Sequence, residues 1–195
     1  AARRVLTLKY DLGLFDDPYR YLDEQREKEI IHSREMMDHA LKSAKESAVL
    51  LKNDPHQGNK LLPLPRHLTS MALIGPLADN QTDLLGSWHA SGTDSLVTTV
   101  KQGLKREFPH TAIRYAQGCD FTGEDKSGFN EALAAARRSD VVVMAIGEKY
   151  TQSGEAASRA DIGLPGVQLE LVKRIVETGK PVIALVMAGR PLTIP

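Results

Sequence analysis

The sequence lacks several features that mark whole classes of protein. Its one cysteine, Cys119, cannot form an internal disulfide, so cysteine content does not distinguish an oxidising from a reducing compartment for this protein. Lysine plus arginine and aspartate plus glutamate both number 25, which argues against the basic surface that nucleic-acid binding needs. The longest apolar runs, such as 141–146 and 182–187, are too short to cross a bilayer. We therefore expect neither a nucleic acid nor a membrane as a partner.

Motifs for nucleotides, metals and serine nucleophiles are also missing. The first strand-like run is followed by Gly75-Pro76-Leu77-Ala78, which is not the glycine fingerprint of dinucleotide-binding proteins. The sequence contains neither a phosphate-binding G-x-x-x-x-G-K-[S/T] segment nor a G-x-S-x-G elbow. Its histidines have no ligand spacing, and Cys119 is expected to be a small core or loop residue. We expect no cofactor and no metal.

The first third of the chain is predicted to be largely helical. Residues 1–11 are typical of a helix that ends at Gly13, and the polar segment 14–32 is expected to be a partly ordered connection. Ser33 can cap a second helix that runs to about Asn53. Apolar residues in this helix are spaced three and four apart, which predicts one buried stripe: Met37, Leu41, Ala44, Ala48 and Leu51.

The rest of the chain alternates strands with helices after a proline-rich loop at 54–69. Strands are predicted at 71–74, 111–116, 141–146 and 182–187, and helices at 97–108, 129–138 and 167–178. Three of these strands, 71–74, 141–146 and 182–187, are continuous runs of Val, Ile, Leu, Ala and Met rather than alternating patterns. This pattern predicts an α/β fold, a mostly parallel sheet flanked by helices on both faces.

Functional groups in such sheets gather in the loops that follow the carboxyl ends of strands. Three loops qualify here: 75–93 with Trp88, 118–128, and the polar loop 147–166 with Glu148 and Glu155. Long loops of this kind are usually functional, although any single glutamate on one is more often a solvated surface residue. Trp88 could be either a core residue or a platform for a ligand.

Several segments resemble the glycoside hydrolases of family 3, and the matches run in order along the whole chain. They are Lys9–Tyr19, Glu46–Asn53 followed by Leu62-Pro63-Leu64, Ile74–Asp79, Gly86-Ser87-Trp88, Ser153–Arg159, Ile162–Gln168, and Met187–Leu192. The likeness is greatest to the periplasmic β-glucosidases of Gram-negative bacteria, so a periplasmic location is expected.

The resemblance implies a two-domain retaining enzyme without a cofactor. Residues 1–32 would be the end of a β/α-barrel domain and a linker, and residues 33–195 would be part of the C-terminal α/β sandwich domain. The nucleophilic aspartate of the family would lie upstream of Ala1, in the barrel domain. The isolated chain is therefore expected to be an inactive fragment whose partner is that missing domain.

The resemblance also assigns roles to residues. Glu155 aligns with the acid/base of the family and Trp88 with the aromatic wall of its aglycone subsite. Glu148 remains a rival for the acid/base role, but Ser153-Gly154 frames Glu155, whereas Glu148 sits at the end of a strand. The substrates would be β-glucosides or oligosaccharides that lose a terminal non-reducing β-D-glucose. The alternative is a non-catalytic carbohydrate-binding or interaction module of the same fold.

Overall fold

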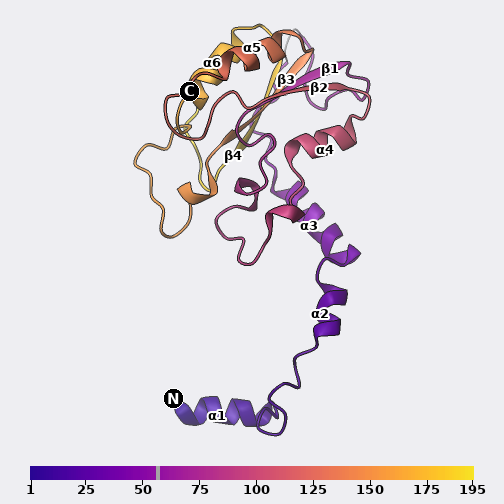
Figure 1. Cartoon of the computed structure of the whole chain (residues 1–195), viewed down its shortest axis with the longest axis vertical. Helices are drawn as coiled ribbons and strands as arrows, with labels where there is room; N and C mark the ends of the chain where they lie inside the picture. The colour runs from indigo at the N-terminus through magenta and orange to yellow at the C-terminus, as the bar shows by residue number, and fades with distance from the viewer. Residues whose placement is uncertain (56–57) are drawn as a thin grey trace. The chain divides into compact units, whose positions relative to one another are not determined.

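A computed structural model describes residues 1–55 and 58–195, which form two compact units, Ala1–Asn53 and Asp54–Pro195 (Figure 1). The sequence predicted a domain boundary after residue 32 instead. A compact unit and an evolutionary domain can begin and end at different residues, so the domain boundary after residue 32 stays a prediction. Residues 56 and 57 of the predicted loop 54–69 lie outside the described residues.

The first unit consists of three helices: α1 (Ala2–Asp11), α2 (Glu24–Ile30) and α3 (Arg34–Ser47). The Ser33 hydroxyl caps α3 by accepting a hydrogen bond from the backbone N–H of Met36, as predicted. Helix α2 lies in a segment that was expected to be only partly ordered. The side chain of Asp23 caps it by accepting from the backbone N–H of Arg26, and this cap supplies the start signal that the apolar pattern lacks.

The predicted buried stripe of α3 is wrong. All five of its residues, Met37, Leu41, Ala44, Ala48 and Leu51, are exposed, and the helix ends at Ser47 rather than near Asn53. Helices in proteins owe most of their stability to the packing of an apolar face. Within its unit, no other element buries this face of α3, and the chain is extended at Ala48, where the predicted helix would have continued.

The second unit is an α/β fold with a fully parallel sheet, as predicted. The described strands are β1 (Ser70–Ile74), β2 (Ala112–Ala116), β3 (Val141–Gly147) and β4 (Val182–Met187), in the order β2-β1-β3-β4. Three helices connect them: α4 (Val100–Glu107), α5 (Phe129–Arg137) and α6 (Gln168–Val176). Short 3₁₀ turns lie in the loops: η1 (Asp83–Leu85), η2 (Asp94–Leu96) and η3 (Tyr150–Gln152).

Both faces of the sheet are covered, which explains the continuous apolar runs. Alternate residues of β1 and β3, such as Ile74 and Met144, pack against α5 and α6. The other set, such as Leu73 and Val143, packs against the face that α4 covers through Leu104. Figure 1 shows α5 and α6 on one side of the sheet and α4 on the other. Strands β1 and β3 are therefore buried on both faces.

The strand order places one crevice at the carboxyl edge of the sheet. The chain leaves β1 through α4 to reach β2 on one side, and it leaves β3 through α6 to reach β4 on the other side. The connections after β1 and β3 therefore lead to helices on opposite faces of the sheet. Such a topological switch point is where open α/β sheets bind ligands.

Candidate functional site

The ends of β1 and β3 are shaped by two glycines. Gly75 has a φ of +121° and Gly147 has a φ of +143°, a backbone region that side chains rarely adopt. A Cβ atom at Gly147 would lie 1.8 Å from the carbonyl oxygen of Met187, and one at Gly75 would lie 2.1 Å from that of Ala145. Both strands therefore need glycine where the chain leaves the sheet for the crevice.

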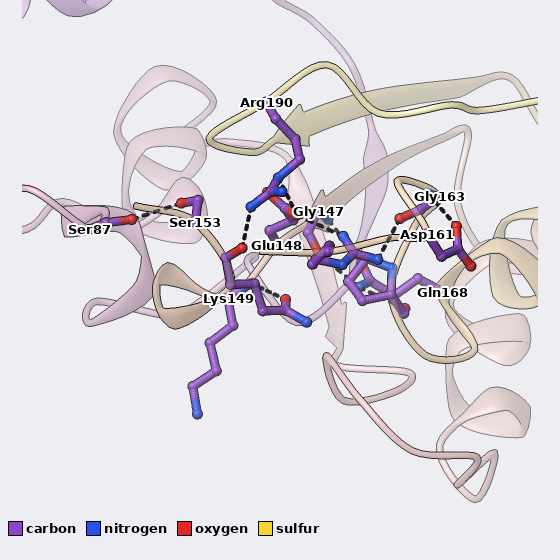
Figure 2. A network of polar contacts seen from close by, with 12 residues as sticks. Ser87, Gly147, Glu148, Lys149, Ser153, Asp161, Gly163, Gln168 and Arg190 are labelled. Atoms are coloured by element: carbon purple, nitrogen blue, oxygen red, sulfur yellow. Dashed lines mark hydrogen bonds and ion pairs between the residues drawn. The ribbon is translucent and has the colours of Figure 1, made fainter. Parts of the chain in front are cut away.

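A buried glutamine closes the base of the loop after β3. The Gln168 side chain accepts from the backbone N–H of Gly147 at 2.9 Å and donates to the carbonyl oxygen of Gly147 at 2.8 Å. It also donates to the carbonyl oxygen of Pro165 at 3.2 Å, and it is fully buried. The start of α6 is thereby bonded to the end of β3 (Figure 2). These hydrogen bonds hold together the two ends of the loop 148–167.

Glu148 is the first residue of this loop and lies at the back of the crevice. Its side chain is 1% exposed and lies between two arginines. Arg159 Nη1 is 2.7 Å from Glu148 Oε1, and Arg190 Nε lies 3.1 Å from Oε1 and 3.3 Å from Oε2. Both carboxylate oxygens therefore accept from guanidinium groups (Figure 2).

The same arginines reach further along the loop. Arg159 Nη2 donates to the carbonyl oxygen of Gly163 at 3.0 Å, and Arg190 Nη2 donates to that of Gln152. Arg190 itself belongs to the loop after β4. A single buried carboxylate thus joins the loops after two neighbouring strands.

The loop after β1 is bonded to the loop after β3 through Ser87. Its hydroxyl donates to the carbonyl oxygen of Tyr150 at 2.9 Å and lies 2.7 Å from the hydroxyl of Ser153. Because the hydrogen of Ser87 is used on Tyr150, Ser153 must be the donor in the second bond. The backbone N–H of Tyr150 also donates to Asp83 at 2.9 Å. The two loops are held together beside Trp88.

Asp79 attaches the start of the β1 loop to α4. Lys101 Nζ lies 2.6 Å from its carboxylate, and the hydroxyl of Thr99 donates to it at 2.9 Å. The hydrogen bond from Lys101 lowers the pKa of the Asp79 carboxyl, and the bond from Thr99 lowers it further, although burial acts in the opposite direction. This carboxylate anchors the loop and is not part of the crevice wall.

The joined loops enclose two adjoining cavities of about 320 and about 300 Å³, a size that suits small-molecule ligands. Trp88, Tyr150 and Ser153 line both of them. Glu148 lines the first cavity and Glu155 lines the second. Trp88 is 74% exposed, so it is not a core residue. Its indole ring is accessible to a ligand in the cavities.

The remaining candidates from the sequence lie elsewhere. No residue of the loop 118–128 lines either cavity. Cys119 is buried in the core under α5, and burial raises the pKa of its thiol to about 11. In the described part of the chain, His, Cys, Asp and Glu form no group that could hold a metal ion. No helix among the described residues is long and apolar enough to span a membrane.

Comparison with known proteins identifies the family. Residues 48–195 match the model of the glycosyl hydrolase family 3 C-terminal domain. The chain belongs to glycoside hydrolase family 3. This confirms the resemblance that the sequence motifs indicated, and the family 3 domain covers the whole sheet and both cavities.

Relatives in the family include two kinds of glycosidase. A β-xylosidase of Formosa agariphila is 41% identical over 100% of this chain and 27% of its own length. A periplasmic β-glucosidase of Salmonella typhimurium is 36% identical over 100% of this chain and 28% of its own length. The chain thus spans about a quarter of the length of these family 3 relatives.

Solved family 3 structures share the fold. The β-glucosidase of Listeria innocua in complex with isofagomine superposes with a TM-score of 0.85 at 39% identity. The superposition covers 97% of this chain and 25% of that enzyme. An exo-β-xylosidase solved with a xylobiose aziridine probe superposes with a TM-score of 0.72 at 34% identity, over 82% of this chain and 20% of that one.

Sequence reasoning missed the network behind the cavities. Arg159, Gln168 and Arg190 were noticed only as members of segments that resemble the family. The two arginines bind Glu148, and Gln168 binds the backbone of Gly147. One feature of the sequence could have indicated the arginines as partners of Glu148. A glutamate that directly follows a fully buried strand needs cationic partners if its side chain turns inward.

Proposed function

We propose that this chain supplies the acid/base loop of a retaining β-glycosidase that removes terminal β-D-glucose from the non-reducing end of its substrates. Glu155 is the acid/base, and Trp88 forms the wall of the aglycone subsite. One observation carries the proposal: Glu155 and Trp88 line the same cavity, formed by two loops that Ser87 and Ser153 bond together.

The contacts of the two glutamates favour Glu155 over Glu148. Glu155 is exposed and has no hydrogen bond or ion pair with the described residues, so its carboxyl is free to turn toward a substrate. Both oxygens of Glu148 accept from Arg159 and Arg190. A general acid must hold a proton within hydrogen-bond reach of the leaving group, and a carboxylate that is already bonded on both oxygens is poorly placed to do so.

The reaction needs a second carboxylate, which would come from the barrel domain. In a retaining glycosidase one carboxylate attacks the anomeric carbon while the acid, about 5–5.5 Å away, protonates the departing oxygen. The same residue then removes a proton from the water that releases the sugar. We expect the isolated chain to be inactive, and the periplasmic relative supports a proposed periplasmic location.

A β-xylosidase is the second candidate, favoured by the 41% identity to the Formosa relative. Xylose lacks the exocyclic CH₂OH of glucose, so the residues around that group would decide between the two sugars. The ratio of kcat/KM for p-nitrophenyl β-glucoside and β-xyloside, measured on the full-length protein, tests this choice. A ratio well above one supports the glucosidase, and a ratio well below one supports the xylosidase.

Azide rescue of the full-length protein tests the role of Glu155. Glu155→Ala should slow the hydrolysis of cellobiose by about 10²–10⁴-fold, the usual contribution of general acid–base catalysis. An aryl glycoside with a good leaving group needs no proton, so its glycosylation step should change much less. Azide should restore turnover of the activated substrate, because it attacks the intermediate without a base.

Glu148→Ala is the comparison variant, and azide should accelerate it far less than Glu155→Ala, because Glu148→Ala keeps the Glu155 carboxyl as the base. Rescue of Glu148→Ala but not of Glu155→Ala would reverse the assignment. Rescue of neither variant would place the acid elsewhere. A full-length wild-type protein that binds glycosides but hydrolyses none of them would leave the non-catalytic module as the correct interpretation.

A further inference from the structure

Glu148, Arg159 and Arg190 form a buried ion-pair network beside the cavities. The reaction proposed for Glu155 does not explain why this network is there. Glu148 is 1% exposed, and its partners Arg159 and Arg190 are 16% and 22% exposed. Taking charges out of water is costly, and apolar residues of similar volume often stabilise a protein as well as a buried ion pair does. Stability alone is therefore a weak reason for this arrangement.

The contacts of the network flank Glu155 on both sides. Before Glu155, the carbonyl oxygen of Gln152 accepts from Arg190. After Glu155, Arg159 is bonded to Glu148 and to the carbonyl oxygen of Gly163. Both limbs of the loop are thus connected to the carboxylate of Glu148 through the two arginines, and Gln168 fixes the backbone of the preceding Gly147.

The tip between these limbs carries Glu155. Among the described residues, the tip 153–158 is hydrogen-bonded to another loop through Ser153, whose hydroxyl donates to that of Ser87. The position of the loop tip over the cavity therefore follows from the points where its limbs are held. A displacement of about 1 Å at a reacting group can cost about 10²-fold in rate.

We propose that Glu148 is a positioning residue. Through Arg159 and Arg190, its carboxylate holds both limbs of the loop 149–163 at the spacing that presents Glu155 to the glycosidic oxygen. The proposal rests on the proposed function of Glu155 and assigns Glu148 no contact with the substrate. A residue of this kind affects the steps that use the acid/base, whereas a purely structural residue affects all steps alike.

The first experiment compares Glu148→Gln with Glu170→Gln in the full-length protein. Glu170 is paired with Lys126 at the surface and lines neither cavity, so its variant removes the same charge away from the site. We measure kcat/KM for cellobiose and for 2,4-dinitrophenyl β-glucoside. Glu148→Gln should lower the value for cellobiose by about 10²-fold and the value for the aryl glucoside only a few-fold. Glu170→Gln should change neither.

The second experiment adds Glu148→Gln to Glu155→Ala. If Glu148 acts through Glu155, the double variant should hydrolyse cellobiose no more slowly than Glu155→Ala alone, because coupled residues give non-additive losses. Additive losses, or equal losses on both substrates in Glu148→Gln, would overturn the positioning proposal while leaving Glu155 as the acid. If Glu155→Ala itself shows no dependence on the leaving group, the proposed function and the positioning proposal both fail.

Arg190→Lys provides the same test if Glu148→Gln does not fold. Lysine keeps the positive charge beside Glu148 but lacks the planar fork that spans Glu148 and the carbonyl oxygen of Gln152. It should lower kcat/KM for cellobiose more than for the aryl glucoside, with a normal thermal unfolding temperature. Equal losses on the two substrates would contradict the proposal.

Discussion

The base of the loop after β3 and its tip, which carries Glu155, differ in their hydrogen bonding. Polar groups at the base are bonded to other protein groups, whereas Glu155 at the tip is left free. At the base, Gly147, Glu148 and Gln168 are buried, and their polar atoms are bonded within the domain. At the tip, the side chain of Glu155 is exposed and has no partner among the described residues, and Trp88 of the facing loop is largely exposed. A site works best when a rigid supporting shell holds groups that are left free for the ligand. The base should therefore govern stability, and the tip should govern binding and rate.

The largest effect on stability is expected for Gly147→Ala at the base. The new Cβ would lie 1.8 Å from a backbone oxygen, at a φ of +143°. Strain of the backbone and overpacking should together lower the free energy of unfolding of the domain by about 3–5 kcal/mol. Calorimetric unfolding of the full-length protein measures the change.

Gly86→Ala is the control for backbone strain alone, because its φ is +74° and a Cβ there meets no atom within 4 Å. We expect a loss of about 1–2 kcal/mol for this variant. Equal losses at the two glycines would mean that the close contact at the strand end has no energetic weight.

Gln168→Leu should have the next largest effect. The change keeps the volume of the side chain but leaves the N–H and carbonyl of Gly147 and the carbonyl of Pro165 without this partner. Unsatisfied buried groups of this kind should cost about 2–4 kcal/mol. The exposed Gln117 offers a control, since Gln117→Leu should change the thermal unfolding temperature little. A stable Gln168→Leu variant would show that the base of the loop needs no such clamp.

Trp88→Ala should have the smallest effect on stability and a clear effect on binding. A largely exposed side chain contributes within about 0.5 kcal/mol to the free energy of unfolding. The flat indole face can stack on the apolar face of a sugar, so KM for cellobiose should rise several-fold while kcat changes less. Trp88→Phe should restore part of the loss. A variant that loses stability but keeps its KM would remove Trp88 from the site.

The sequence predicted the sheet well because β1, β3 and β4 are continuous apolar runs whose lengths and order leave few alternatives. Helix α4 begins at Val100, three residues later than predicted, because Thr99 and Gln102 form a capping box. The exposure of α3 was not predictable, since periodicity shows that a face is apolar but does not show whether another surface covers it.

The residues that line the two cavities were predicted only in part, through the family resemblance. Motifs indicated Trp88 and Glu155, and the structure brings both to one cavity. The burial of Glu148 depends on Arg159 and Arg190, which come from different loops. Likewise, the bond between Ser87 and Ser153 joins residues 66 positions apart. Single-sequence patterns carry no information on such long-range pairs, because the fold alone brings them together.

The configuration of the glycosyl azide made by Glu155→Ala tests the central claim most directly. In the full-length protein, azide should attack the glycosyl-enzyme from the face that the aglycone has left, which gives a β-glycosyl azide. Proton NMR of the product distinguishes the two anomers. The account predicts the β-glycosyl azide from Glu155→Ala and much less of it from Glu148→Ala, which keeps the Glu155 carboxyl as the base. An α-glycosyl azide from Glu155→Ala, or a β-glycosyl azide from Glu148→Ala alone, would contradict it.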